Sequence, residues 1–136
     1  MTPFGERVRA LREDKGVTLK QMAADLHISS AYLSALEHGK RGQPSIQLVR
    51  QICGYFGIIW EEAEELERLA EISHPRVTVD TSGLTPRATE LANRLSERIH
   101  ELDEAALEQL LALFDELLAD RPPSPRRRTG TRRRYF

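Results

Sequence analysis

Residues 29–40 read Ser-Ser-Ala-Tyr-Leu-Ser-Ala-Leu-Glu-His-Gly-Lys and contain the start and stop signals of a short helix. Ser29 is an N-cap candidate, because its hydroxyl can accept a hydrogen bond from an amide of the first turn. Gly39 favours a helix stop. Leu33 and Leu36 give the helix one buried face, whereas positions 30, 31, 34 and 35 carry only Ser and Ala. A face without large side chains is suited to close approach to another surface.

A second short helix is expected directly before this segment. Thr18-Leu19-Lys20-Gln21 has the Thr-x-x-Gln pattern of a capping box and predicts a helix from Thr18 to Leu26. Only His27-Ile28 separate the two helices. Two short helices joined by so tight a turn form the helix-turn-helix pattern.

Many positions in the first half of the chain agree in register with one known pattern: Leu11-Arg12, Lys15-Gly16, Thr18-Leu19, Ala23, Leu26, Ile28-Ser29, Tyr32-Leu33-Ser34, Leu36-Glu37, Gly39-Lys40 and Pro44-Ser45. In these positions the chain resembles the phage-repressor-like (Cro/C1, XRE) helix-turn-helix family. The resemblance implies a five-helix, all-α DNA-binding domain. His27 departs from the family pattern, which usually has glycine in the turn. We expect a positive φ there, which histidine tolerates at modest cost.

The resemblance implies that residues 29–38 form a recognition helix in the major groove of double-stranded DNA. The residues implied to face base edges are Ser30, Ala31, Tyr32, Ser34 and His38. Small side chains form few bidentate hydrogen bonds with bases, so specificity is expected to depend also on close backbone fit and DNA deformability. For Tyr32, half-buried packing is the alternative role.

Phosphate contacts are expected at two helix starts and in the loop after the recognition helix, from Thr18, Lys20, Gln21, Ser29, Lys40, Arg41, Gln43 and Ser45. Free amides at a helix start attract phosphate, and the resemblance places the loop along the sugar-phosphate backbone. By composition alone the loop would be an ordinary polar turn. The resemblance also implies a structural ion pair between Arg12 and Glu37; a solvated charge or a phosphate contact is the alternative for Arg12.

Helical periodicity predicts further helices at Pro3–Lys15, Ser45–Phe56, Ile58–Ser73, Pro86–Glu101 and Asp103–Ala119. Ile46 and Ile59 are expected to face inward, and Val77–Val79 could form a short strand at most. The expected organisation is a DNA-binding domain (1–74), a linker (75–85), an antiparallel helical hairpin (86–120) and a disordered Arg-rich tail (121–136).

Charge is strongly segregated along the chain. Residues 1–56 have a net charge of +3, residues 57–120 of −11, and residues 121–136 of +7. Six glutamates between positions 61 and 71 predict a solvated helix face or a docking surface for a basic partner: RNA polymerase, a small basic protein such as a toxin, or the chain's own arginine tail. The tail itself is expected to attract DNA phosphates nonspecifically or to act as a solubilising segment.

The last predicted helix has a wide apolar stripe, formed by Leu107, Leu110, Leu111, Phe114, Leu117 and Leu118. We expect this stripe to mediate homodimerisation; packing on the N-terminal domain is the alternative. The expected function is therefore that of a dimeric, sequence-specific DNA-binding transcriptional repressor. The alternative is an antitoxin-type protein that binds a basic partner through its acidic C-terminal helices and autoregulates its operon.

Enzymatic activity, a cofactor and a bound metal are not expected. The sequence has no phosphate-binding glycine loop, nucleophile elbow or zinc-helix motif, and its four histidines share no ligand spacing. A single cysteine and the absence of an apolar run near the ~20 residues that cross a bilayer indicate a cytoplasmic protein without a membrane partner.

Overall fold

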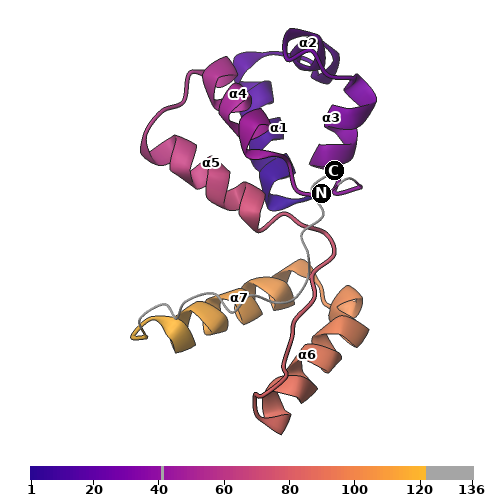
Figure 1. Cartoon of the computed structure of the whole chain (residues 1–136), viewed down its shortest axis with the longest axis vertical. Coiled ribbons are helices and arrows are strands. Elements are labelled where there is room, and N and C mark those ends of the chain that lie inside the picture. Colours follow the sequence, from indigo (N-terminus) through magenta and orange to yellow (C-terminus); the bar gives the residue numbers. More distant parts are fainter. Residues whose placement is uncertain (41, 122–136) are drawn as a thin grey trace. The chain divides into compact units, whose positions relative to one another are not determined.

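The computed structural model describes residues 1–40 and 42–121, and all assignments below concern those residues. The elements are α1 (Pro3–Lys15), α2 (Leu19–Asp25), α3 (Ser30–Glu37), α4 (Ile46–Phe56), α5 (Glu61–Glu71), α6 (Pro86–Arg98), the 3-10 helix η1 (Ile99–Glu101) and α7 (Glu104–Leu118) (Figure 1). The described part of the chain is thus all-helical, and the short strand considered near Val77 does not form there. It divides into two compact units, Met1–Val77 and the residues from Thr78 onward.

The first unit has one hydrophobic core, to which each of its helices contributes. α3 packs against α1 and α2, whereas α5 packs against α1 and α4. α1 therefore supports both the predicted recognition helix and α5. The buried apolar residues are Phe4, Val8, Met22, Ala23, Leu33, Leu36, Leu48, Val49, Ile52, Cys53, Leu66 and Ala70.

Side-chain caps define the starts of the first four helices. Thr2, Thr18, Ser29 and Ser45 each accept a hydrogen bond from an amide in the first turn of the helix that follows. Such a cap satisfies one of the amides that have no partner inside the helix, and replacing it by alanine typically costs about 1 kcal/mol. The capping box predicted at Thr18 is confirmed.

α5 begins later than predicted, at Glu61 instead of Ile58. Gly57 ends α4 with a φ of 65°, and Trp60 has a φ of 55°, so the backbone leaves the helical path twice before α5 starts. The prediction that Ile59 faces inward is wrong, because this residue lies in the turn and is 66% exposed. Ile46 is also exposed, since it is the first residue of α4 and precedes the buried stripe of that helix.

Cys53 is buried within α4. Burial raises the pKa of the Cys53 thiol, and the nearby Glu67 carboxylate raises it further. Because the thiolate is the reactive form, both effects lower the reactivity of this cysteine.

The second unit contains α6, η1 and α7. Asp103 caps α7, and its carboxylate accepts a hydrogen bond from the Ala106 amide at 2.8 Å. The last turn of the helix predicted to reach Glu101 is 3-10. None of α6, η1 and α7 contains a buried residue, so the close antiparallel pairing expected of a hairpin is not confirmed.

Candidate nucleic-acid interface

α3 has two faces of different character. Leu33, Leu36 and Glu37 are buried against the core. On the opposite face Ser30 and Ala31 are exposed. Ser34 is partly exposed, one turn after Ser30. The structure therefore brings three of the predicted base-facing residues to one surface with no long side chain among them.

The other two residues predicted to face bases lie in different environments. Tyr32 is half-buried and packs against the core, so the packing role considered for it is present. His38 is exposed at the C-cap of α3, and its Nδ1 lies 2.8 Å from the Ser34 carbonyl oxygen. This contact holds the imidazole beside the last turn of the helix.

The turn between α2 and α3 is fixed by backbone geometry. His27 has the expected positive φ, at 57°. The Ile28 amide donates to the Ala23 carbonyl at 3.0 Å, and the Ile28 side chain packs against the core. These contacts fix the direction in which α3 leaves α2.

Three predicted phosphate contacts are hydroxyl residues that already act as helix caps. The oxygens of Thr18, Ser29 and Ser45 accept hydrogen bonds from the amides of Gln21, Tyr32 and Leu48. Accepting such a bond leaves the hydroxyl hydrogen available for donation to a phosphate oxygen.

Two further predicted phosphate contacts, Lys20 and Gln21, lie in the first turn of α2. Gln21 is less available than the hydroxyls, because its side-chain oxygen accepts from the Thr18 amide at 3.4 Å. Lys20 is exposed.

The loop after α3 carries the remaining predicted phosphate contacts. Lys40 is exposed, and its amide donates to the Ala35 carbonyl at 2.9 Å, which ends the helix. Gln43 is half-buried, and the following Pro44 is buried. Arg41 lies outside the described residues, as does most of the predicted Arg-rich tail.

Arg12 and Glu37 form an ion pair between α1 and α3. Arg12 Nη2 lies 3.3 Å from Glu37 Oε2, and the side chains are only 15% and 3% exposed. Arg12 Nε and Glu37 Oε1 are also buried, and neither has a hydrogen-bond partner among the described residues. The pair is therefore well shielded from water but incompletely hydrogen-bonded.

Sequence reasoning missed two sets of contacts between helices of the first unit. A methyl group on Gly5 would lie 2.1 Å from the Glu37 carbonyl oxygen, so only glycine permits this close crossing of α1 and α3. The second is a cluster of Lys15, Tyr55 and Asp25. Lys15 Nζ lies 4.1 Å from the centroid of the Tyr55 ring, and Tyr55 Oη donates to Asp25 Oδ2 at 2.7 Å. These partners lie 30 and 40 positions apart, so no periodic pattern reveals them.

Comparison with known proteins identifies this arrangement. Residues 3–66 match the family model described as "Helix-turn-helix domain". The chain is similar to an HTH-type transcriptional repressor, RghR of Bacillus subtilis, with 34% identity over 82 residues, covering 57% of this chain and 61% of the relative. Residues 3–66 therefore form a helix-turn-helix domain, and the chain is related to HTH-type transcriptional regulators.

Two other relatives differ from RghR in coverage, and one of them is named as an activator. An uncharacterized HTH-type regulator, RghRB of Bacillus subtilis, is 27% identical over 131 residues, covering 88% of this chain and 94% of the relative. The HTH-type transcriptional activator BcrR of Enterococcus faecalis is 35% identical over 71 residues, covering 50% and 34% respectively. No solved structure matches the chain.

Neither a metal-binding cluster nor a membrane-spanning helix is found in the described part of the chain. No group of three or more His, Cys, Asp or Glu residues in residues 1–40 and 42–121 could hold a metal ion. Over the same residues, the helices are too short or too polar to cross a bilayer.

Proposed function

We propose that the protein is a sequence-specific repressor that inserts α3 into the major groove of its operator. The observation that carries the proposal is the face formed by Ser30, Ala31 and Ser34. Its small side chains allow close backbone approach, while the buried leucines behind it fix the helix on the core. An α-helix fits the B-DNA major groove. Repression is favoured over activation because RghR, whose match is longer than that of the activator BcrR, is named as a repressor.

The same proposal assigns the surrounding polar residues to the DNA backbone. Thr18, Ser29 and Ser45 would donate their hydroxyl hydrogens to phosphates, and Lys20 and Lys40 would supply positive charge. Gln21, Gln43 and Arg41 complete the predicted set. His38, held at the C-terminal end of α3, would contact the edge of the site.

We further propose that the operator is bound by a homodimer formed through α7. Five residues of the predicted apolar stripe are 44–65% exposed, namely Leu110, Leu111, Phe114, Leu117 and Leu118. The sixth, Leu107, is half-buried. Exposed apolar patches of this kind mark association surfaces in soluble proteins. A dimer would place two recognition helices on half-sites about 34 Å apart. The antitoxin alternative remains a prediction, since the relatives reported above are all named as transcriptional regulators.

Selection of duplexes from a randomised DNA pool tests the recognition helix. The full chain should enrich a defined sequence, and Ala31→Glu should abolish that preference, because a carboxylate would face the acceptor-rich groove and the phosphates. Ala105→Glu, the same substitution at an exposed position of α7, should bind the selected duplex normally. If Ala31→Glu bound as tightly as Ala105→Glu, α3 would not be the reading element.

Sedimentation equilibrium tests the dimer. Phe114→Lys should weaken self-association by about 30-fold, as expected for loss of ~2 kcal/mol at a central apolar contact. Gln109→Lys, which adds the same charge at an exposed polar position of α7, should leave the dimer intact. A monomeric parent chain at micromolar concentration would refute the dimer but not the role of α3.

A further inference from the structure

The turn between α4 and α5 exposes a tryptophan in a strained backbone conformation. Trp60 is 81% exposed and Ile59 beside it is 66% exposed. Trp60 has φ 55° and ψ −125°, a conformation that bulky residues rarely adopt. Two large apolar side chains displayed together indicate a contact surface.

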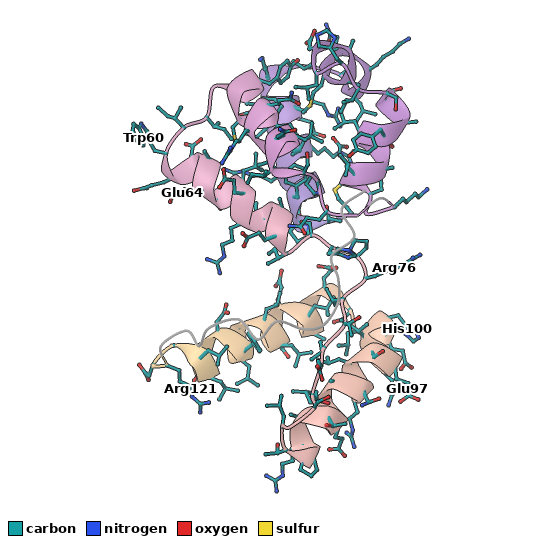
Figure 2. All side chains as sticks on the ribbon, viewed as in Figure 1. Trp60, Glu64, Arg76, Glu97, His100 and Arg121 are labelled. Carbon is teal, nitrogen blue, oxygen red and sulfur yellow. The ribbon has the colours of Figure 1, made fainter. Side chains whose placement is uncertain are left out.

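Negative charge surrounds this tryptophan. The first turn of α5 carries Glu61, Glu62 and Glu64, all exposed, and none is in an ion pair with a described residue. Trp60 and Glu64 lie at the same end of α5 and both project away from the ribbon (Figure 2). We call Ile59, Trp60 and these three glutamates the Trp60 edge.

The charge of the Trp60 edge disfavours DNA as its ligand. Its three exposed carboxylates would repel phosphates. The helix that carries them, α5, packs against α1 and α4. A flat aromatic ring beside carboxylates instead favours guanidinium groups, which stack on tryptophan and pair with carboxylates.

We propose that the Trp60 edge binds the chain's own arginine-rich C-terminal segment, residues 122–136. This segment contains six arginines, at positions 126–128 and 132–134, and no acidic residue. Its charge and its side-chain type both complement the edge. A second copy of the edge is disfavoured as the occupant, because two such surfaces carry the same charge.

Tethering supports this occupant over a free partner. A segment joined to the same chain has an effective concentration in the millimolar range when its linker can span the distance to the site. Fifteen extended residues span up to ~50 Å, whereas the eleven residues of α5 extend for about 16 Å. The segment is therefore long enough to follow the whole helix. Docking would hold the arginines away from phosphates, so the acidic edge would limit nonspecific attraction to DNA.

Trp60 is the single tryptophan of the chain, so its fluorescence reports on this edge alone. Acrylamide quenching is compared between the full chain and a variant with all six of these arginines changed to serine. At low salt the quenching constant of the unmodified chain should be about two-fold lower, because a stacked guanidinium covers one face of the indole. At ~1 M NaCl the difference should shrink, since charges are screened within about 3 Å.

A second variant tests the acidic half of the contact. Glu61→Gln/Glu62→Gln/Glu64→Gln should raise quenching of the otherwise unmodified chain to the level of the arginine variant. Equal quenching of parent and arginine variant at low salt would overturn the proposal, and is also the result expected if a separate basic protein occupies the edge. Neither outcome affects the role proposed for α3, which the Ala31→Glu duplex selection tests independently.

Discussion

Removing one partner of the Arg12–Glu37 pair should destabilise the first unit far more than removing both. Arg12→Met leaves the Glu37 carboxylate, 3% exposed, without a charged partner. Breaking a buried ion pair in this way costs about 3–5 kcal/mol. The cost should fall near the upper end, because Glu37 Oε1 already lacks a hydrogen-bond partner among the described residues and cannot compensate.

The geometry indicates that the intact pair contributes little net stability. One contact of 3.3 Å joins the two groups, which corresponds to about 5 kcal/mol of Coulomb attraction at an effective dielectric constant of ~20. Desolvating the two ions costs several kcal/mol each, and hydrogen bonds do not fully satisfy either group. Arg12→Met/Glu37→Leu should therefore lie within about 2 kcal/mol of the parent protein.

Urea unfolding followed by far-ultraviolet circular dichroism provides the measurement. The four members of the double-mutant cycle are compared by their urea midpoints, with the slope of the free energy of unfolding against urea held equal. The expected coupling energy between Arg12 and Glu37 is above ~2 kcal/mol. Arg9→Met is the matched control, because Arg9 pairs with Glu13 at the surface and should cost less than ~1 kcal/mol. Additive losses, or an Arg12→Met variant no less stable than Arg9→Met, would refute the reasoning.

Three further changes follow from local geometry, each measured by chemical denaturation. Gly5→Ala should cost more than ~3 kcal/mol, because its methyl group would lie 2.1 Å from a backbone oxygen of Glu37; a loss below 1 kcal/mol would contradict this close crossing. His27→Gly should stabilise by up to ~1 kcal/mol, since glycine removes the cost of a positive φ; an unchanged midpoint would indicate no strain. Tyr55→Phe should cost about 1 kcal/mol at neutral pH. The hydrogen bond to Asp25, then burial and the Asp25 charge, raise the pKa of Tyr55. The stabilisation that Tyr55 contributes is therefore complete below the ordinary tyrosine pKa of ~10, and it is lost as the pH rises through the raised pKa. If the free energy of unfolding of Tyr55→Phe and of the parent changed in parallel with pH above ~10, this account would be contradicted.

The helical order and the two-helix motif were predictable because local signals determine them. The Thr18 capping box and the hydrophobic spacing around Leu33 specify helices and faces within a few residues. Both signals depend on neighbours in the sequence, so they can be recognised without knowledge of the tertiary structure. The positive φ of His27 was instead expected from the family resemblance, because glycine usually occupies that turn position.

Contacts between distant segments were harder to predict from the sequence. The pairing of Tyr55 with Asp25 spans 30 positions and leaves no periodic trace. The late start of α5 depends on Trp60, whose backbone conformation no residue preference would suggest. The residues proposed to contact DNA rest on the family resemblance together with their exposure, because small side chains such as Ser30 carry little chemical signal of their own.

The hydrogen bond from the Phe4 amide to Ser73 Oγ, 2.8 Å long, joins residues 69 positions apart near the two ends of the first unit. During synthesis the amide of Phe4 cannot find this partner until Ser73 has left the ribosome, so the unit closes only when nearly all of its residues are available. A fragment ending at residue 66, where the family match stops, would lack that closure and the end of α5. An isolated DNA-binding fragment should therefore extend beyond Ser73.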